Sequence, residues 1–120
     1  MKTILKITLF SLFSAMMLLA AGVDGSWKST FTAPDGVERT STFVLQSDGE
    51  KLLGKIGGAT GDAEIKNGAV KGADVSFQIT IDYNGQPMLL RYEGKVDGDE
   101  LKLKVTYNEE GSFEIVAKRQ

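Results

Sequence analysis

The residue types that most often carry enzyme chemistry are missing from this sequence. It contains no histidine and no cysteine, which removes the commonest general base, the commonest transition-metal ligand and the thiol nucleophile. Carboxylates remain, but they gather at turns, where an Asp side chain stabilises the turn by bonding nearby backbone. Asp97 and Asp99 supply too few oxygens for a calcium site, which needs about six or more. We therefore expect no enzyme, no metal site and no cofactor.

Three polar side chains are candidates for ligand contact: Arg39, Tyr83 and Tyr92. By alternation Arg39 points to the apolar face of its segment, so its guanidinium lies either in water at the rim of the fold or inside a pocket. In the second case it shares the polar part of a ligand pocket with Tyr92 and two hydroxyl residues. These two are Ser29 and Ser41.

Turn signals divide the sequence after residue 25 into short segments of alternating apolar and polar residues. Such spacing is typical of an antiparallel meander, in which consecutive strands pair as hairpins. Seven turn signals connect eight strands. They are Pro34-Asp35-Gly36, Ser47-Asp48-Gly49, Gly61-Asp62, Gly72-Ala73-Asp74, Asn84-Gly85, Asp97-Gly98 and the run from Asn108 to Gly111.

Strict alternation over three successive segments decides the fold class. Val75 to Ile81, Met88 to Val96 and Leu101 to Tyr107 each place one face in a dry interior and the other in water. We predict an all-β protein, an eight-stranded antiparallel up-and-down meander β-barrel. The fourth segment, Ala63 to Lys71, is interrupted at Asn67-Gly68 and is either a bulged strand or a tiny hairpin. A barrel of this size is filled by its own side chains or holds one small ligand.

Residues 1–22 have the pattern of a secretory signal peptide. Lys2 and Lys6 precede an apolar run from Ile7 to Ala21 with small residues at its end, so we expect cleavage after Ala21 or Gly22. The alternative is an uncleaved membrane anchor, but no basic stop-transfer cluster follows. We expect residues 23–120 to form one secreted or periplasmic barrel domain without a stable membrane anchor after cleavage.

The charge of the predicted domain argues against nucleic acid as a partner. Without Lys2 and Lys6, twelve of the fourteen basic residues remain against sixteen acidic ones, a net charge of about −4. The absence of cysteine excludes disulfides and an N-terminal lipid-modified cysteine, so packing alone must stabilise the barrel.

The sequence predicts that its first and last strands meet at Trp27 and Arg119. Counting by twos from Ile115, Arg119 faces inward, where the face of the single Trp ring can accept its guanidinium through a cation–π contact. With Gly25 these residues form a Gly-x-Trp motif in the first strand and an inward Arg in the last. In this pattern residues 25–119 resemble the calycin superfamily of lipocalins and avidins. The resemblance implies a barrel closed at the Trp–Arg end, with an open mouth that admits a small apolar ligand. It carries over no ligand-binding residue.

Two functions of different classes follow as alternatives. One is a binding module that holds a small apolar ligand at the open end of the barrel, with Tyr83, Arg39 and Tyr92 as contacts. The other is a filled barrel whose loops contact a protein or a glycan, a protease inhibitor being a special case. The loops of the open end, including the glycine-rich run from Gly57 to Gly61, are the longer ones and favour this end for any contact. A cavity of a few hundred cubic ångströms distinguishes a binding module from a filled barrel.

Overall fold

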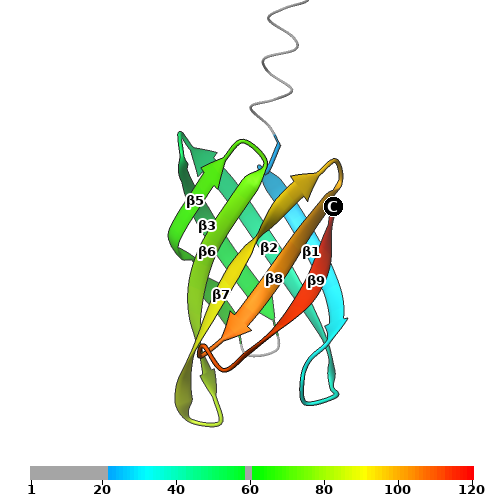
Figure 1. Ribbon diagram of the computed structural model, residues 1–120, viewed down its shortest axis with the longest axis vertical. Helices are drawn as coiled ribbons and strands as arrows, with labels where there is room; N and C mark the ends of the chain where they lie inside the picture. Colours follow the sequence, from blue (N-terminus) through cyan, green and yellow to red (C-terminus); the bar gives the residue numbers. More distant parts are fainter. Residues whose placement is uncertain (1–21, 59–60) are drawn as a thin grey trace, which may run out of the picture.

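Segments in which apolar and polar residues alternate form the strands of a single β-sheet (Figure 1). The computed structural model describes residues 22–58 and 61–120. The strands in chain order are β1 (Gly25–Thr32), β2 (Glu38–Asp48), β3 (Lys51–Gly58), β4 (Gly61–Glu64), β5 (Lys66–Lys71), β6 (Asp74–Tyr83), β7 (Gln86–Asp97), β8 (Glu100–Tyr107) and β9 (Gly111–Arg119). Within the described ranges, no helix is long and apolar enough to cross a membrane.

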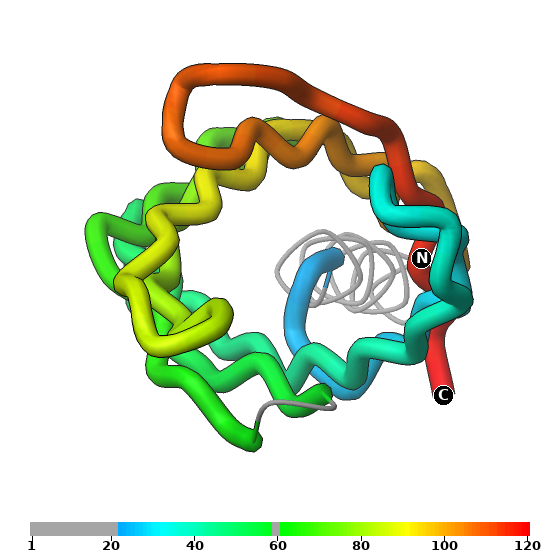
Figure 2. The backbone as a smooth tube through the Cα atoms, turned by 90° about the horizontal axis from the view of Figure 1, so that it is seen from below, coloured from blue at the N-terminus to red at the C-terminus, as the bar shows by residue number. Residues whose placement is uncertain are grey.

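The sheet closes into a barrel because its last strand returns to its first. Consecutive strands pair antiparallel, except that β4 and β5 both pair with β3, and β9 then pairs with β1, where Trp27 lies opposite Arg119 and Lys28 opposite Lys118. Viewed along its length in Figure 2, the backbone forms a ring. The predicted eight-stranded antiparallel barrel is therefore confirmed, with β4 and β5 together forming its fourth strand.

The fourth strand is bulged, which decides between the two predicted alternatives. It breaks at Ile65, whose backbone N–H donates to the carbonyl of Gly54, and the register with β6 shifts between Lys66 and Ala69. Asn67 adopts a positive φ of 53° inside this irregularity. As a result β5 pairs with both β3 and β6, whereas β4 pairs only with β3 among the described strands.

The two ends of the barrel differ in how they are filled. The turns that follow β2, β5 and β7 lie at the end where β1 begins and β9 finishes, which we call the closed end. The largest fully buried side chains pack in the closed-end half and the middle of the barrel: Trp27, Phe43, Leu52, Phe77, Leu101 and Val105. At the opposite, open end, inward side chains surround a cavity. The barrel is thus filled in one part and hollow in the other.

Candidate functional site

The closed end is built around the contact between Trp27 and Arg119. The indole is fully buried, and the guanidinium carbon of Arg119 lies 4.2 Å from the centroid of its ring. The Trp27 Nε1–H donates to the carbonyl of Val23 at 2.9 Å. The ring therefore has its N–H paired, as a buried tryptophan usually does, and its face covered by a cation.

A short segment before β1 completes this closure, a feature that the sequence did not predict. Arg119 donates from Nη1 to the carbonyl of Asp24 at 2.9 Å and from Nη2 to that of Gly22 at 2.6 Å. Val23 is buried in the core, and this segment runs inside the outline of the barrel in Figure 2. The Asp24 carboxylate accepts hydrogen bonds from the backbone N–H and the hydroxyl of Ser47. Residues 22–24 thus form a plug across the closed end.

The backbone conformation two residues before Trp27 explains why a glycine, Gly25, occupies this position. Its φ is +130°, a conformation that other L residues rarely adopt, and a Cβ there would meet Nη1 of Arg119 at 3.4 Å. Gly25 lies where the plug ends and β1 begins, and its conformation allows the backbone to change direction there. Gly25, Trp27 and Arg119 consequently lie together and hold one end of the barrel.

The open end contains a cavity of about 440 Å³, within the size range of small-molecule sites. Its wall is mainly apolar and comes from inward-facing residues of β1, β3, β6, β7 and β9. The main apolar contributors are Phe31, Ile56, Ile79, Ile81, Met88, Leu90 and Phe113. Such a surface can accommodate an apolar molecule, because burying apolar area removes it from water.

Aromatic stacking closes the wall beside β1 and β9. Phe31 and Phe113 stack with ring centroids 5.5 Å apart, and Tyr107 lies 6.0 Å from Phe113. In the described structure β1 and β9 pair only at Trp27 and Lys28, so these rings lie beyond the paired part of the two strands, toward the open end. The cavity wall therefore depends here on side chains rather than on backbone hydrogen bonds.

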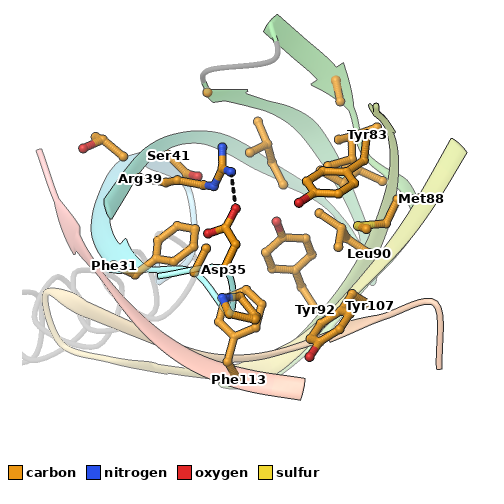
Figure 3. A pocket seen from close by; sticks show the side chains of 18 of the residues that line it. Phe31, Asp35, Arg39, Ser41, Tyr83, Met88, Leu90, Tyr92, Tyr107 and Phe113 are labelled. Carbon is orange, nitrogen blue, oxygen red and sulfur yellow. Dashed lines mark hydrogen bonds and ion pairs between the residues drawn. The ribbon is translucent and has the colours of Figure 1, made fainter. Parts of the chain in front are cut away.

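The three predicted contact residues, Arg39, Tyr83 and Tyr92, all line this cavity (Figure 3). Ser41 lines it as well. Ser29 does not: it is buried below the cavity, and its hydroxyl has no hydrogen-bond partner among the described residues. Of the predicted glycine-rich run, Ala59 and Thr60 lie outside the described residues, as does the predicted signal sequence up to residue 21.

Tyr92 supplies a polar group deep in the cavity. Its ring stacks on Phe77 with centroids 4.8 Å apart and meets the edge of Phe43 at 5.9 Å, which fixes its position on β7. Only 5% of the residue is exposed, and burial raises the pKa of its phenol, so the hydroxyl stays protonated. Figure 3 shows this hydroxyl directed into the cavity, and none of the side-chain hydrogen bonds between described residues uses it.

Arg39 forms an ion pair with Asp35, a residue for which the sequence predicted only a role in stabilising a turn. Its Nη2 donates to Oδ2 of Asp35 at 2.8 Å, across the turn between β1 and β2. Asp35 does stabilise this turn, because its Oδ1 accepts the backbone N–H of Val37 at 3.0 Å. The opposite charges four residues apart on either side of Gly36 were the signal in the sequence that pointed to this pair.

The cavity can hold a molecule with an apolar body and a polar end. Its polar groups are one ion pair, several hydroxyls and the exposed carboxylate of Glu110. Across residues 22–58 and 61–120, no group of three or more His, Cys, Asp or Glu side chains is placed to hold a metal ion.

Comparison of the chain with models of protein families, with curated proteins and with solved structures found no match. The architecture is compatible with the predicted calycin-like barrel, and what can be inferred about function rests on the geometry of the cavity.

Proposed function

We propose that this protein is an exported, calycin-like binding module that holds a small, largely apolar molecule in the cavity at its open end. The observation that carries the proposal is the cavity of about 440 Å³ with an apolar wall, into which the phenol of Tyr92 is directed without a hydrogen-bond partner among the described residues. An apolar pocket with a few convergent polar groups is the usual design of a small-molecule site. Binding without catalysis is the proposed activity.

The alternative function, a filled barrel that contacts a protein or glycan through its loops, requires a packed interior. The hollow at the open end favours the binding module instead. Export is proposed on the N-terminal pattern, a basic start followed by an apolar run and small residues. Sequencing the N-terminus of protein recovered from outside the cytoplasm tests it, with a first residue near Gly22 expected.

Native mass spectrometry of protein purified from its own host tests the binding function. We expect a fraction of the protein to carry an additional mass of a few hundred daltons, typical of a ligand for such a cavity. The matched pair of variants is Ile81→Trp, which places a larger ring in the cavity and leaves less room for a ligand, and Thr80→Trp, which adds the same side chain to the outer face of β6. Loss of the additional mass in the first variant alone supports the proposal. Retention in both variants would place the ligand elsewhere.

A further inference from the structure

Among the described residues that line the cavity, no positively charged side chain is unpaired. Among the described lining residues, Arg39 is the only positively charged one, and its guanidinium is paired with Asp35 at 2.8 Å (Figure 3). The remaining charged lining residue, Glu110, is an exposed carboxylate at the mouth. A ligand in the cavity therefore meets a neutralised ion pair and, beyond it, negative charge.

The turn between β1 and β2 holds Asp35 in its position beside Arg39. Both carboxylate oxygens are engaged, Oδ1 with the backbone N–H of Val37 and Oδ2 with Arg39. Two backbone hydrogen bonds tighten the same turn, from Ala33 N–H to the Val37 carbonyl and from Gly36 N–H to the Ala33 carbonyl, each 2.9 Å long. The hydrogen bonds from Val37 and then Arg39 lower the pKa of Asp35, so it is ionised at neutral pH.

A carboxylate ligand is disfavoured by this arrangement. To enter the cavity it must lose its water shell, and burying a charge is costly unless a partner of opposite charge compensates it. Arg39 cannot compensate it fully, because the anchored Asp35 would remain beside the same guanidinium and repel the incoming anion. An ammonium group must also lose its water shell. Arg39 repels it, the Asp35 charge is already paired, and the remaining carboxylate, Glu110, is exposed at the mouth, where water screens its charge.

An uncharged ligand meets none of these costs. The Tyr92 hydroxyl is protonated and without a described partner, so it can donate a hydrogen bond to a carbonyl or ether oxygen of such a ligand. The apolar wall contacts the rest of the molecule.

We propose that Asp35 is a specificity-determining residue: by neutralising Arg39 in the mouth of the cavity, it makes the site selective for uncharged apolar ligands with a hydrogen-bond acceptor and excludes carboxylates. This inference rests on the proposed binding function and deepens it.

Three probes on one aromatic skeleton test the selectivity by calorimetric titration at neutral pH. They are 2-acetylnaphthalene, which is uncharged and has one acceptor, 2-naphthoate, and 2-naphthylmethylammonium. For the unaltered barrel we expect the ketone to bind at least about tenfold more tightly than either charged probe. If none of the three binds, the proposed function fails; if the naphthoate or the ammonium binds most tightly, only the selectivity inference fails.

The variant Asp35→Asn tests the role of this residue. The amide oxygen can still accept the Val37 N–H, while Arg39 loses its counter-charge, so we expect naphthoate affinity to rise about tenfold or more and ketone affinity to change less than about threefold. The double variant Asp35→Asn, Arg39→Gln should abolish that gain. Asp82→Asn is the matched control, because Asp82 accepts a backbone N–H in another open-end turn without lining the cavity. An unchanged naphthoate affinity in folded Asp35→Asn, or an equal gain in Asp82→Asn, would overturn the inference.

Discussion

The guanidinium of Arg119, near the end of the chain, covers the ring of Trp27, near its beginning, at 4.2 Å from the centroid. This contact joins the two strands whose pairing closes the barrel. Because the indole is fully buried, we expect Trp27→Ala to lower the free energy of unfolding by about 3–5 kcal/mol, the usual cost of removing a large buried aromatic. Chemical denaturation measures this. A loss below about 1 kcal/mol would contradict the buried role of the ring.

Arg119 also tests the plug formed by residues 22–24. A lysine keeps the charge but cannot reproduce the forked hydrogen bonds to the carbonyls of Gly22 and Asp24. We expect Arg119→Lys to cost about 1–3 kcal/mol of unfolding free energy in denaturant titrations. Lys118→Ala, at the exposed neighbour on β9, is the control and should change it by less than about 0.5 kcal/mol. Equal effects of the two variants would show that the plug contributes nothing.

Gly54 is needed where β2 and β3 approach closely. A Cβ at this position would collide with the backbone carbonyl of Val44, and a carbonyl held in a ladder cannot move aside cheaply. We expect Gly54→Ala to destabilise the barrel by about 2 kcal/mol or more. Gly58→Ala on the same strand is the control, since its Cβ would lie 3.7 Å from the nearest atom, an ordinary contact. Thermal unfolding of both variants provides the comparison, and similar melting temperatures would refute the close-approach account.

Because the Tyr92 phenol is buried, we expect the free energy of unfolding to depend on pH in the alkaline range. Burial raises its pKa in the folded state above the ordinary value of 10.0, so the folded protein keeps a proton that the unfolded chain releases. The stabilisation is therefore complete below about pH 10 and declines as pH rises further, by at most about 1.4 kcal/mol per pH unit. Tyr92→Phe should show a smaller decline than the unaltered protein in denaturant titrations from pH 9 to 11, which are about one unit either side of that value.

The same Tyr92→Phe variant separates stability from function. Because the described structure offers its hydroxyl no partner, removing the oxygen at neutral pH should leave the unfolding free energy within about 1 kcal/mol of the original or raise it. Affinity for a ligand with an acceptor oxygen should fall by about threefold to tenfold. A large loss of stability with unchanged affinity would show that the hydroxyl serves packing and not binding.

Alternation and turn signals were sufficient for the strands, because inward and outward residues repeat every second position. The contact of Trp27 with Arg119 was also predictable, since both residues face inward near the ends of the first and last strands, which closure of the barrel brings together. The plug was not, because nothing in the composition of residues 22–24 indicates hydrogen bonds to a side chain 95 residues away. The sequence also did not show whether the barrel is hollow. Whether inward residues fill a barrel depends on its cross-section, which periodicity does not determine.

The occupancy of the open-end cavity is tested most directly with N-phenyl-1-naphthylamine, an uncharged aromatic probe that fluoresces more strongly in apolar surroundings. We expect saturable binding of one probe per barrel to the unaltered protein and to the outer-face variant Thr80→Trp, and binding weakened by about tenfold or more in Ile81→Trp, whose larger ring occupies part of the cavity. Circular dichroism should confirm that all three proteins are folded. Equal binding by all three folded proteins, or by none, would contradict the account.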